Sequence, residues 1–245
     1  MKPNWNPLHR IWNMYQANEV PSSLSSAVSG SDPHHLAFLR QMNKDLRYIN
    51  SSQIPLADWE VVVVDLETTG FQPHHGDEII MIGAVAMRGT QILEQENFST
   101  LVNPKRTLPA HIERLTGITA ETLQVAPDLI SALSRFFQFV GNRTLIAHHS
   151  RHERDFFQSA LWKSSRAKFV HRLLDTMTLI RLIEKNISDS SLDTLCARHQ
   201  IPISHRHNAY HDALAAAKLW AIYLDKTIQL GLHDLQDVYQ RISRQ

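Results

Sequence analysis

The stretch VVVVDLETTG, from Val61 to Gly70, decides the fold of this chain. Four consecutive β-branched residues favour a strand that is buried on both faces, as in the middle of an α/β sheet. The run ends in two carboxylates, Asp65 and Glu67, which point to the same side if the strand extends that far. Two carboxylates at a strand end suit Mg²⁺ or Mn²⁺, which prefer oxygen ligands. Two solvated surface acids are the alternative.

Composition sets limits on the function. The 245 residues, 43% hydrophobic and 20% charged, fit one globular domain with an extension. The 25 Lys and Arg residues nearly balance the 24 Asp and Glu residues. The protein therefore lacks the overall positive charge that would bind a long nucleic-acid duplex, whereas local binding of a strand end stays compatible with this composition. The single cysteine, Cys196, excludes an intramolecular disulfide and is predicted to lie in the core. Without an apolar run of membrane-spanning length or a signal-peptide pattern, we expect a cytoplasmic protein that does not contact membranes.

The chain divides into three parts by its patterns. Residues 1–57 combine helix-like pieces with a Ser- and Pro-rich linker at Pro21–Pro33, and we expect them to pack on the main domain. An α/β domain is predicted at 58–224 and a helical tail at 225–245. The strands are predicted at 61–66, at 78–102 as two strands joined by a turn at Arg88-Gly89, at 144–149 and near 169–174. The helices are predicted at 111–115, 129–140, 151–162, 176–184, 192–199 and 208–224. This order favours a mixed sheet with helices on its faces.

Three motifs carry the chemistry. DLETTG resembles the first motif of the DEDD exonucleases, the family that includes the proofreading epsilon subunit of bacterial replicative polymerases. HHSRHERDFF, residues 148–157, resembles the second motif in part, with Glu153 where the family has Asp and Asp155 as the competing acid. Helical geometry favours Glu153, which lies three and four residues before Phe156 and Phe157 on the apolar stripe, whereas Asp155 lies about 200° away from Glu153 round the helix. An ordinary boundary Glu of an amphipathic helix is the alternative.

The third motif is HNAYHD, from His207 to Asp212, which resembles the H-x-A-x-x-D pattern of the histidine subclass, DEDDh. A histidine and an acid five residues apart lie about 140° apart on one helix and do not converge. We therefore expect His207 in the loop before the last long helix and Asp212 in the first turns of that helix.

The resemblance implies a ribonuclease H-like fold with a five-stranded mixed sheet and an N-terminal helical extension. It implies that four acids hold two divalent cations, Mg²⁺ or Mn²⁺, and that His207 takes the proton from an attacking water. These metal-binding and catalytic acids are Asp65, Glu67, Glu153 and Asp212. The substrate-binding residues implied by the family are Thr68, Thr69, Gly70, His148 and Phe156.

The expected function is a 3′–5′ exonuclease that releases nucleoside monophosphates from nucleic acid 3′ ends. Single-stranded DNA is favoured as the substrate, and a DNA polymerase or repair protein as the partner. Two alternatives stay open. One is an exoribonuclease that trims RNA, since only a pocket that admits or rejects a 2′-OH separates the two substrates. The other is a catalytically degenerate module that binds nucleic acid or protein, which the irregular second motif supports.

Overall fold

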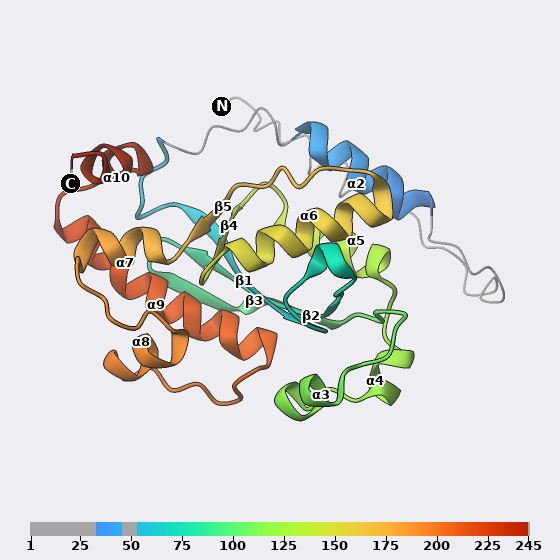
Figure 1. Ribbon diagram of the computed structural model, residues 1–245. Helices are drawn as coiled ribbons and strands as arrows, with labels where there is room; N and C mark the ends of the chain where they lie inside the picture. Colours follow the sequence, from blue (N-terminus) through green and yellow to red (C-terminus); the bar gives the residue numbers. More distant parts are fainter. Residues whose placement is uncertain (1–32, 46–52, 245) are drawn as a thin grey trace. The chain divides into compact units, whose positions relative to one another are not determined.

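The computed structural model describes residues 33–45 and 53–244 of the chain. Residues 32–245 group as one compact unit, whose described residues are drawn in colour in Figure 1. The linker predicted at Pro21–Pro33 lies outside the described residues, apart from Pro33 itself.

A five-stranded sheet with the order β3-β2-β1-β4-β5 forms the centre of this unit (Figure 1). Strand β1 pairs antiparallel with β2 and parallel with β4; β2 and β3 are antiparallel, and β4 and β5 are parallel. The predicted mixed sheet with its flanking helices is therefore confirmed. The strands are β1 (Glu60–Thr68), β2 (Ile79–Arg88), β3 (Gln91–Leu101), β4 (Thr144–Ala147) and β5 (Leu173–Asp175).

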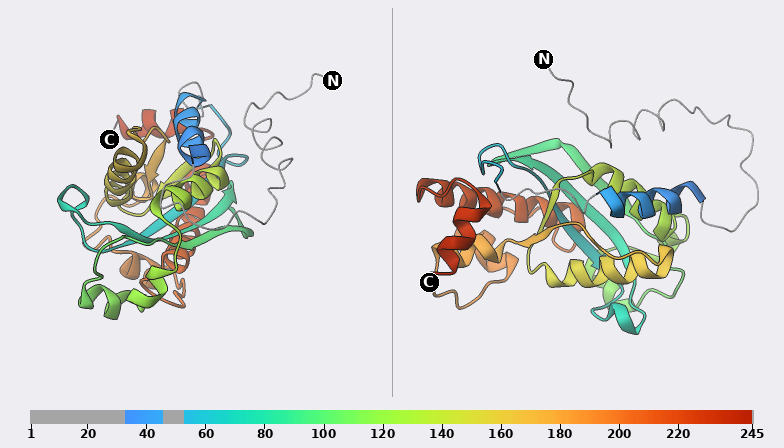
Figure 2. Two further views of the ribbon diagram at one scale, coloured as in Figure 1. Left: turned by 90° about the vertical axis from the view of Figure 1, so that its right-hand side faces the viewer. Right: turned by 90° about the horizontal axis from the view of Figure 1, so that it is seen from above.

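Helices cover both faces of the sheet, as Figures 1 and 2 show. Alternate side chains of β1 serve two separate cores. Val61 and Val63 pack with α7, α8, α9 and α10, whereas Val62 and Val64 pack with α2, α5 and α6. The four valines are thus buried on both faces, as predicted. The helices of the first core are α7 (Met177–Ile183), α8 (Leu192–Arg198), α9 (Ala209–Gln229) and α10 (Leu235–Ile242). Those of the second are α2 (Pro33–Asp45), α5 (Leu129–Val140) and α6 (Arg151–Ser165).

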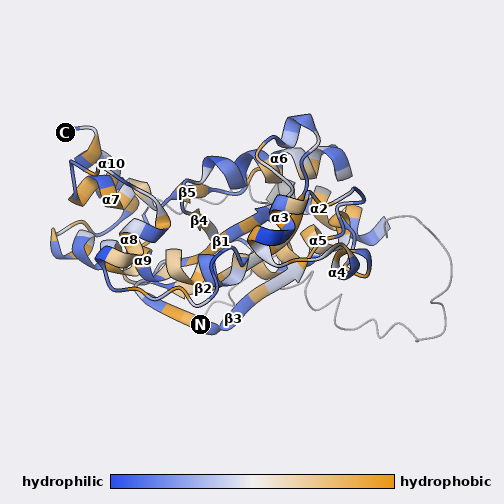
Figure 3. Ribbon diagram, turned by 60° about the horizontal axis from the view of Figure 1, so that its bottom comes forward, coloured by the Kyte–Doolittle hydropathy of each residue, from blue (hydrophilic) through white to orange (hydrophobic). Residues whose placement is uncertain are grey.

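Helix α2 belongs to the predicted N-terminal extension and packs on α5 and α6. Leu39 and Met42 on this helix are buried in the second core. Figure 3 shows both hydrophilic and hydrophobic residues along α5, α6 and α10, as expected of helices with one buried and one exposed side. The predicted packing of the extension on the domain is therefore observed for α2. Cys196 is buried in the first core, as predicted.

Several boundaries differ from the predictions. The short helices α3 (Ala110–Thr116) and α4 (Ala120–Gln124) follow β3, and only α3 was expected. Strand β4 ends at Ala147 instead of residue 149, because His149 takes a positive φ of 56° that a strand does not accommodate. Helix α9 continues to Gln229, beyond the expected end at residue 224. In the described part of the chain, no helix has the length and apolar character needed to cross a membrane.

Candidate functional site

Three of the four predicted acids meet at one edge of the sheet. Asp65 and Glu67 come from the end of β1, and Asp212 comes from the first turn of α9. Carboxylate oxygens of the three lie within 4.8 Å of one another. Glu153, in the first turn of α6, is outside that group, but its charge raises the pKa of Asp65, so it lies close enough to act on the cluster. The structure thus gathers a core of three acids with a fourth beside it.

Sheet topology explains why residues so far apart in sequence converge. Strands β1 and β4 are parallel, so their carboxyl ends reach the same edge, and α6 with Glu153 follows β4 directly. Gly83 pairs with Asp65 across the β1–β2 ladder. A Cβ atom on Gly83 would lie 2.1 Å from the backbone nitrogen of Tyr210. Only glycine therefore lets the start of α9, with Asp212, approach this point of the sheet.

Burial disfavours the ionised form of all four acids. It raises the pKa of Asp65 well above the usual value, and the charges of Glu153, Glu67 and Asp212 raise it further. Burial also raises the pKa of Glu67 to about 7 and that of Glu153 to about 8. It raises the pKa of Asp212 as well, against the lowering effect of Arg206. Four acids that resist ionisation together are the donor set that a divalent cation would stabilise.

Two buried oxygens in the cluster lack hydrogen-bond partners among the described residues. They are Oε2 of Glu153 and Oδ1 of Asp212. Glu153 is only 3% exposed. Because a buried carboxylate oxygen without a partner is costly, both atoms fit the ligand role that the family resemblance gives them toward a metal ion. The residues present therefore match the chemistry of a Mg²⁺ or Mn²⁺ site.

The competing acid of the second motif points away from the site. The side chain of Asp155 is 42% exposed, and a carboxylate oxygen lies 3.6 Å from Nε of Arg151 one turn earlier. The inward position predicted for Glu153 is therefore confirmed, whereas its role as a metal ligand stays a prediction.

His207 takes the position predicted for it, in the turn just before α9. Its φ is 61°, and its backbone N–H donates to Oδ2 of Asp212 at 3.1 Å. The side chain of Asn208 caps the helix by accepting hydrogen bonds from two backbone N–H groups. His207 lines a pocket of about 200 Å³ together with Asp65, Glu67 and Asp212. A histidine and the acid cluster thus face one small cavity.

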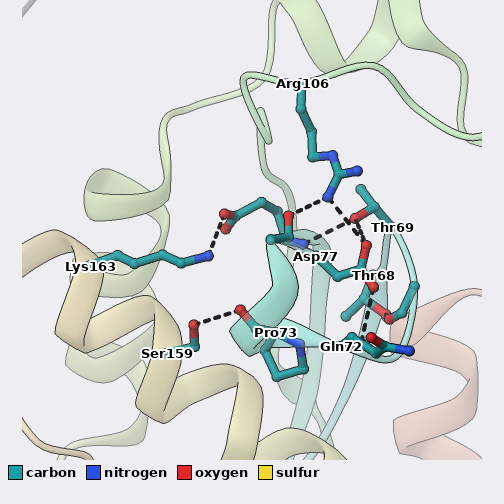
Figure 4. Close-up of polar contacts among 11 residues, drawn as sticks. Thr68, Thr69, Gln72, Pro73, Asp77, Arg106, Ser159 and Lys163 are labelled. Atoms are coloured by element: carbon teal, nitrogen blue, oxygen red, sulfur yellow. Dashed lines mark hydrogen bonds and ion pairs between the residues drawn. The ribbon is translucent and has the colours of Figure 1, made fainter.

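The loop between β1 and β2 borders the same pocket, and Figure 4 shows the polar contacts within this loop. Thr68 and Gly70 line the pocket. Thr69 instead supports the loop, because its hydroxyl donates to Asp77 at 3.1 Å and accepts from the backbone N–H of Glu78 at 3.0 Å. Asp77 also accepts from the backbone N–H of Gln72 at 3.0 Å. The loop that carries the predicted substrate residues is thus held in place by hydrogen bonds to the carboxylate of Asp77.

Two predicted substrate contacts have other surroundings. The ring nitrogens of His148 lie 2.6 Å from the hydroxyl of Thr176 and 2.8 Å from the backbone oxygen of Ser190, so both are engaged within the protein. Phe156 is 2% exposed and packs in the second core, with its ring 4.7 Å from that of His152. Direct substrate contact by Phe156 does not fit this burial. We correct its role to core packing beneath His152.

Two further residues at the site were not predicted from the sequence. Phe71 is 84% exposed, and its ring meets that of His152 edge-on at 5.9 Å, at the pocket wall. The sequence signal for Phe71 was its place as an apolar residue directly after the glycine of a tight turn. Arg206 donates to Asp212, and its position next to His207 was the signal for it.

Comparison with known proteins identifies the domain. The model of the exonuclease family RNase_T matches residues 62–220, about two thirds of the chain. The chain belongs to this exonuclease family. The predicted DEDDh exonuclease resemblance is therefore confirmed, and the domain is that of a nuclease enzyme.

Related sequences include proteins named as DNA polymerase III. The exonuclease domain is 32% identical over 179 residues to DNA polymerase III PolC-type of Caldanaerobacter subterraneus, covering 73% of this chain and 12% of that protein. It is 34% identical over 213 residues to a DNA polymerase III subunit epsilon-like protein of Rhodobacter capsulatus, covering 83% of this chain and 30% of that one. The chain thus spans less than a third of the length of these relatives.

Solved exonuclease structures share the fold. The nuclease domain of 3′hExo, a DEDDh family member bound to rAMP, has a TM-score of 0.60 at 19% identity, covering 70% of this chain and 92% of that one. Exonuclease X in complex with 5′ overhanging duplex DNA has a TM-score of 0.58 at 18% identity, covering 73% and 99%. At these identities the similarity establishes the ribonuclease H-like fold of the exonuclease domain.

Proposed function

We propose that this chain is a 3′–5′ exonuclease that depends on divalent cations and removes nucleoside monophosphates one at a time from the 3′ end of single-stranded DNA. The observation that carries the proposal is the pocket in which His207 faces the acids Asp65, Glu67 and Asp212. Glu153 lies beside them, and one of its buried oxygens has no hydrogen-bond partner in the part of the chain that the structure describes. The family membership supplies the reaction class, phosphodiester hydrolysis.

Each residue has a role in this proposal. Asp65, Glu67, Glu153 and Asp212 would hold two cations, Mg²⁺ or Mn²⁺. When bound, such ions lower the pKa of a water and neutralise charge on the phosphate. His207 would accept the proton of the attacking water at a ring nitrogen, since the residue lines the pocket and its backbone N–H donates to Asp212.

The substrate end would be held by the β1–β2 loop. Thr68 and Gly70 line the pocket, and the exposed Phe71 offers a ring on which a terminal base can stack. A pocket of about 200 Å³ fits the end of one strand, which supports removal of one terminal nucleotide at a time, and the preference for single-stranded DNA stays a proposal from the sequence. The domain extents 1–57, 58–224 and 225–245, and the cytoplasmic location, stay proposals from the sequence.

The choice of DNA follows the relatives. Similar proteins are named as DNA polymerase III components, and we propose a DNA polymerase or a repair protein as the partner. RNA is the second candidate, because one structural neighbour binds rAMP and another recognises a histone mRNA stem-loop. The degenerate binding module is the third reading, and activity alone separates it from the other two.

The test is a gel assay on 5′-labelled DNA and RNA strands of the same sequence with Mn²⁺. We expect a ladder that shortens from the 3′ end of DNA in the wild type and is absent in Asp65→Ala and His207→Ala. Asp155→Asn serves as the matched control, because Asp155 is an acid of the same helix as Glu153 that faces away from the site. A ladder on RNA alone would change the substrate. Intact binding without cleavage of either strand would favour the degenerate module.

A further inference from the structure

Arg206 connects the acid cluster to a carboxylate that no motif includes. Its Nε donates to Oδ1 of Asp193, on α8, at 2.8 Å. Its Nη1 donates to Oδ2 of Asp212, on α9. The partners differ sharply in burial, since the Asp193 side chain is 60% exposed and that of Asp212 is 2% exposed. One guanidinium thus links a surface acid to a buried one.

The two oxygens of Asp212 have unequal surroundings. Oδ2 accepts from the Arg206 guanidinium and from the backbone N–H of His207. Oδ1 is buried and has no partner among the described residues. Two donors on one oxygen fix the plane of the carboxylate and leave the lone pairs of the other oxygen open to a ligand.

We propose that Asp193 and Arg206 are positioning residues that orient Asp212 so that Oδ1 is presented to a metal ion. Asp193 holds the guanidinium from α8, and the guanidinium holds Oδ2 of Asp212. Arginine suits this position because its planar fork reaches two carboxylates at once, which the single ammonium of a lysine does not reproduce. Asp193 also balances the arginine's positive charge, which would otherwise oppose a cation at the cluster.

The inference rests on the proposed function, because it concerns the metal site of that function. If Arg206 orients a ligand, its removal weakens metal binding, although a positive charge has left the neighbourhood of the cation. If Arg206 only repels cations or only supports the fold, its removal tightens metal binding or leaves it unchanged.

The test measures Mn²⁺ binding to the full chain in the absence of nucleic acid. Calorimetry and the electron paramagnetic resonance signal of free Mn²⁺ both monitor the binding. We expect Arg206→Gln to raise the Kd for Mn²⁺ by on the order of 10-fold or more, the usual range for losing a residue that orients a metal ligand. Arg206→Lys should lie between Arg206→Gln and the wild type. Asp193→Asn should weaken binding, and the double variant should bind no more weakly than Arg206→Gln alone, because both residues act through one contact.

The matched control is the exposed ion pair of Arg88 and Asp58, where the N···O distance is 3.3 Å. Arg88→Gln should leave the Kd for Mn²⁺ unchanged. Wild-type affinity or tighter binding in Arg206→Gln would overturn the proposal. If that variant does not fold, the same outcomes are read from Arg206→Lys. A wild type that binds no Mn²⁺ would refute the metal site of the proposed function itself, which is a different result.

Discussion

Replacement of Glu153 by glutamine tests the acid cluster through stability alone. Glu153 ionises near pH 4.5 in the unfolded chain, but burial raises its pKa in the folded protein to about 8. Between these values the folded state holds a proton that the unfolded state has released. The free energy of unfolding therefore falls as pH rises through this window. Glutamine has nearly the same shape and no proton to bind, so Glu153→Gln removes this loss.

The size of the effect follows from the two pKa values. Each pH unit above 4.5 costs the wild type about 1.4 kcal/mol until the folded pKa is reached. Without metal, Glu153→Gln should then exceed the wild type in unfolding free energy by about 1 kcal/mol at pH 5 and about 3 kcal/mol at pH 7. For a domain of this size, the difference at pH 7 corresponds to about 6–12 °C in Tm.

Thermal unfolding in EDTA at both pH values measures this difference, and a repeat with Mn²⁺ measures the metal contribution. The wild type should gain Tm with Mn²⁺, because a ligand that binds only the folded state stabilises it, and Glu153→Gln should gain less. Asp155→Asn, at the exposed acid of the same helix, should show no dependence of this kind. Two results would refute the raised pKa of Glu153. One is a Tm of Glu153→Gln below that of the wild type at pH 7, and the other is a difference in Tm that is the same at pH 5 and at pH 7.

Three further predictions follow from single residues. Burial lowers the pKa of His171 to about 4, so the stability that this residue contributes is present above pH 6.5 and is lost as pH falls toward 4. The wild type therefore loses unfolding free energy between pH 7 and pH 5. In acid denaturation curves, His171→Phe should reduce this loss by about 2 kcal/mol. Gly83→Ala forces a Cβ against the backbone of Tyr210, and we expect about 1–3 kcal/mol of destabilisation in urea melts together with weaker Mn²⁺ binding. Asp77→Ala removes the carboxylate that ties the β1–β2 loop, so KM for DNA should rise more than kcat falls in steady-state assays, whereas a fall in kcat alone would place Asp77 in the chemistry.

Much of this fold could be predicted because local pattern and tertiary structure agree. The valine run of β1 is buried on both faces, as such a run predicts. The inward position of Glu153 could be predicted, because its spacing from Phe156 and Phe157 is a property of the helix itself. The spacing of His207 and Asp212 required a loop before a helix, and the structure has one. These inferences depend on geometry within one element.

The features that were missed depend on contacts between elements. Arg206 bridges α8 and α9, and no pattern within either helix predicts that contact. The importance of Gly83 appears only when α9 is placed against β2. Phe156 was assigned to substrate by analogy with its motif, but three-dimensional packing buries it beneath His152. The short helix α4 begins at a Thr119 cap whose role becomes visible only from its hydrogen bond to Thr122.

The cost of the acid cluster bears on whether the domain catalyses or only binds. Keeping Glu153 protonated at pH 7 costs about 3 kcal/mol of a stability that is usually about 5–15 kcal/mol. A binding module without metal chemistry would gain stability from replacing this residue, or Asp65, by an uncharged side chain, and substitutions of that kind are easy to reach. In this chain all four acids are retained, one of them with a changed length, and two of their buried oxygens are open to ligands. The irregular second motif is therefore better explained by a metal site with slightly altered geometry than by a lost one.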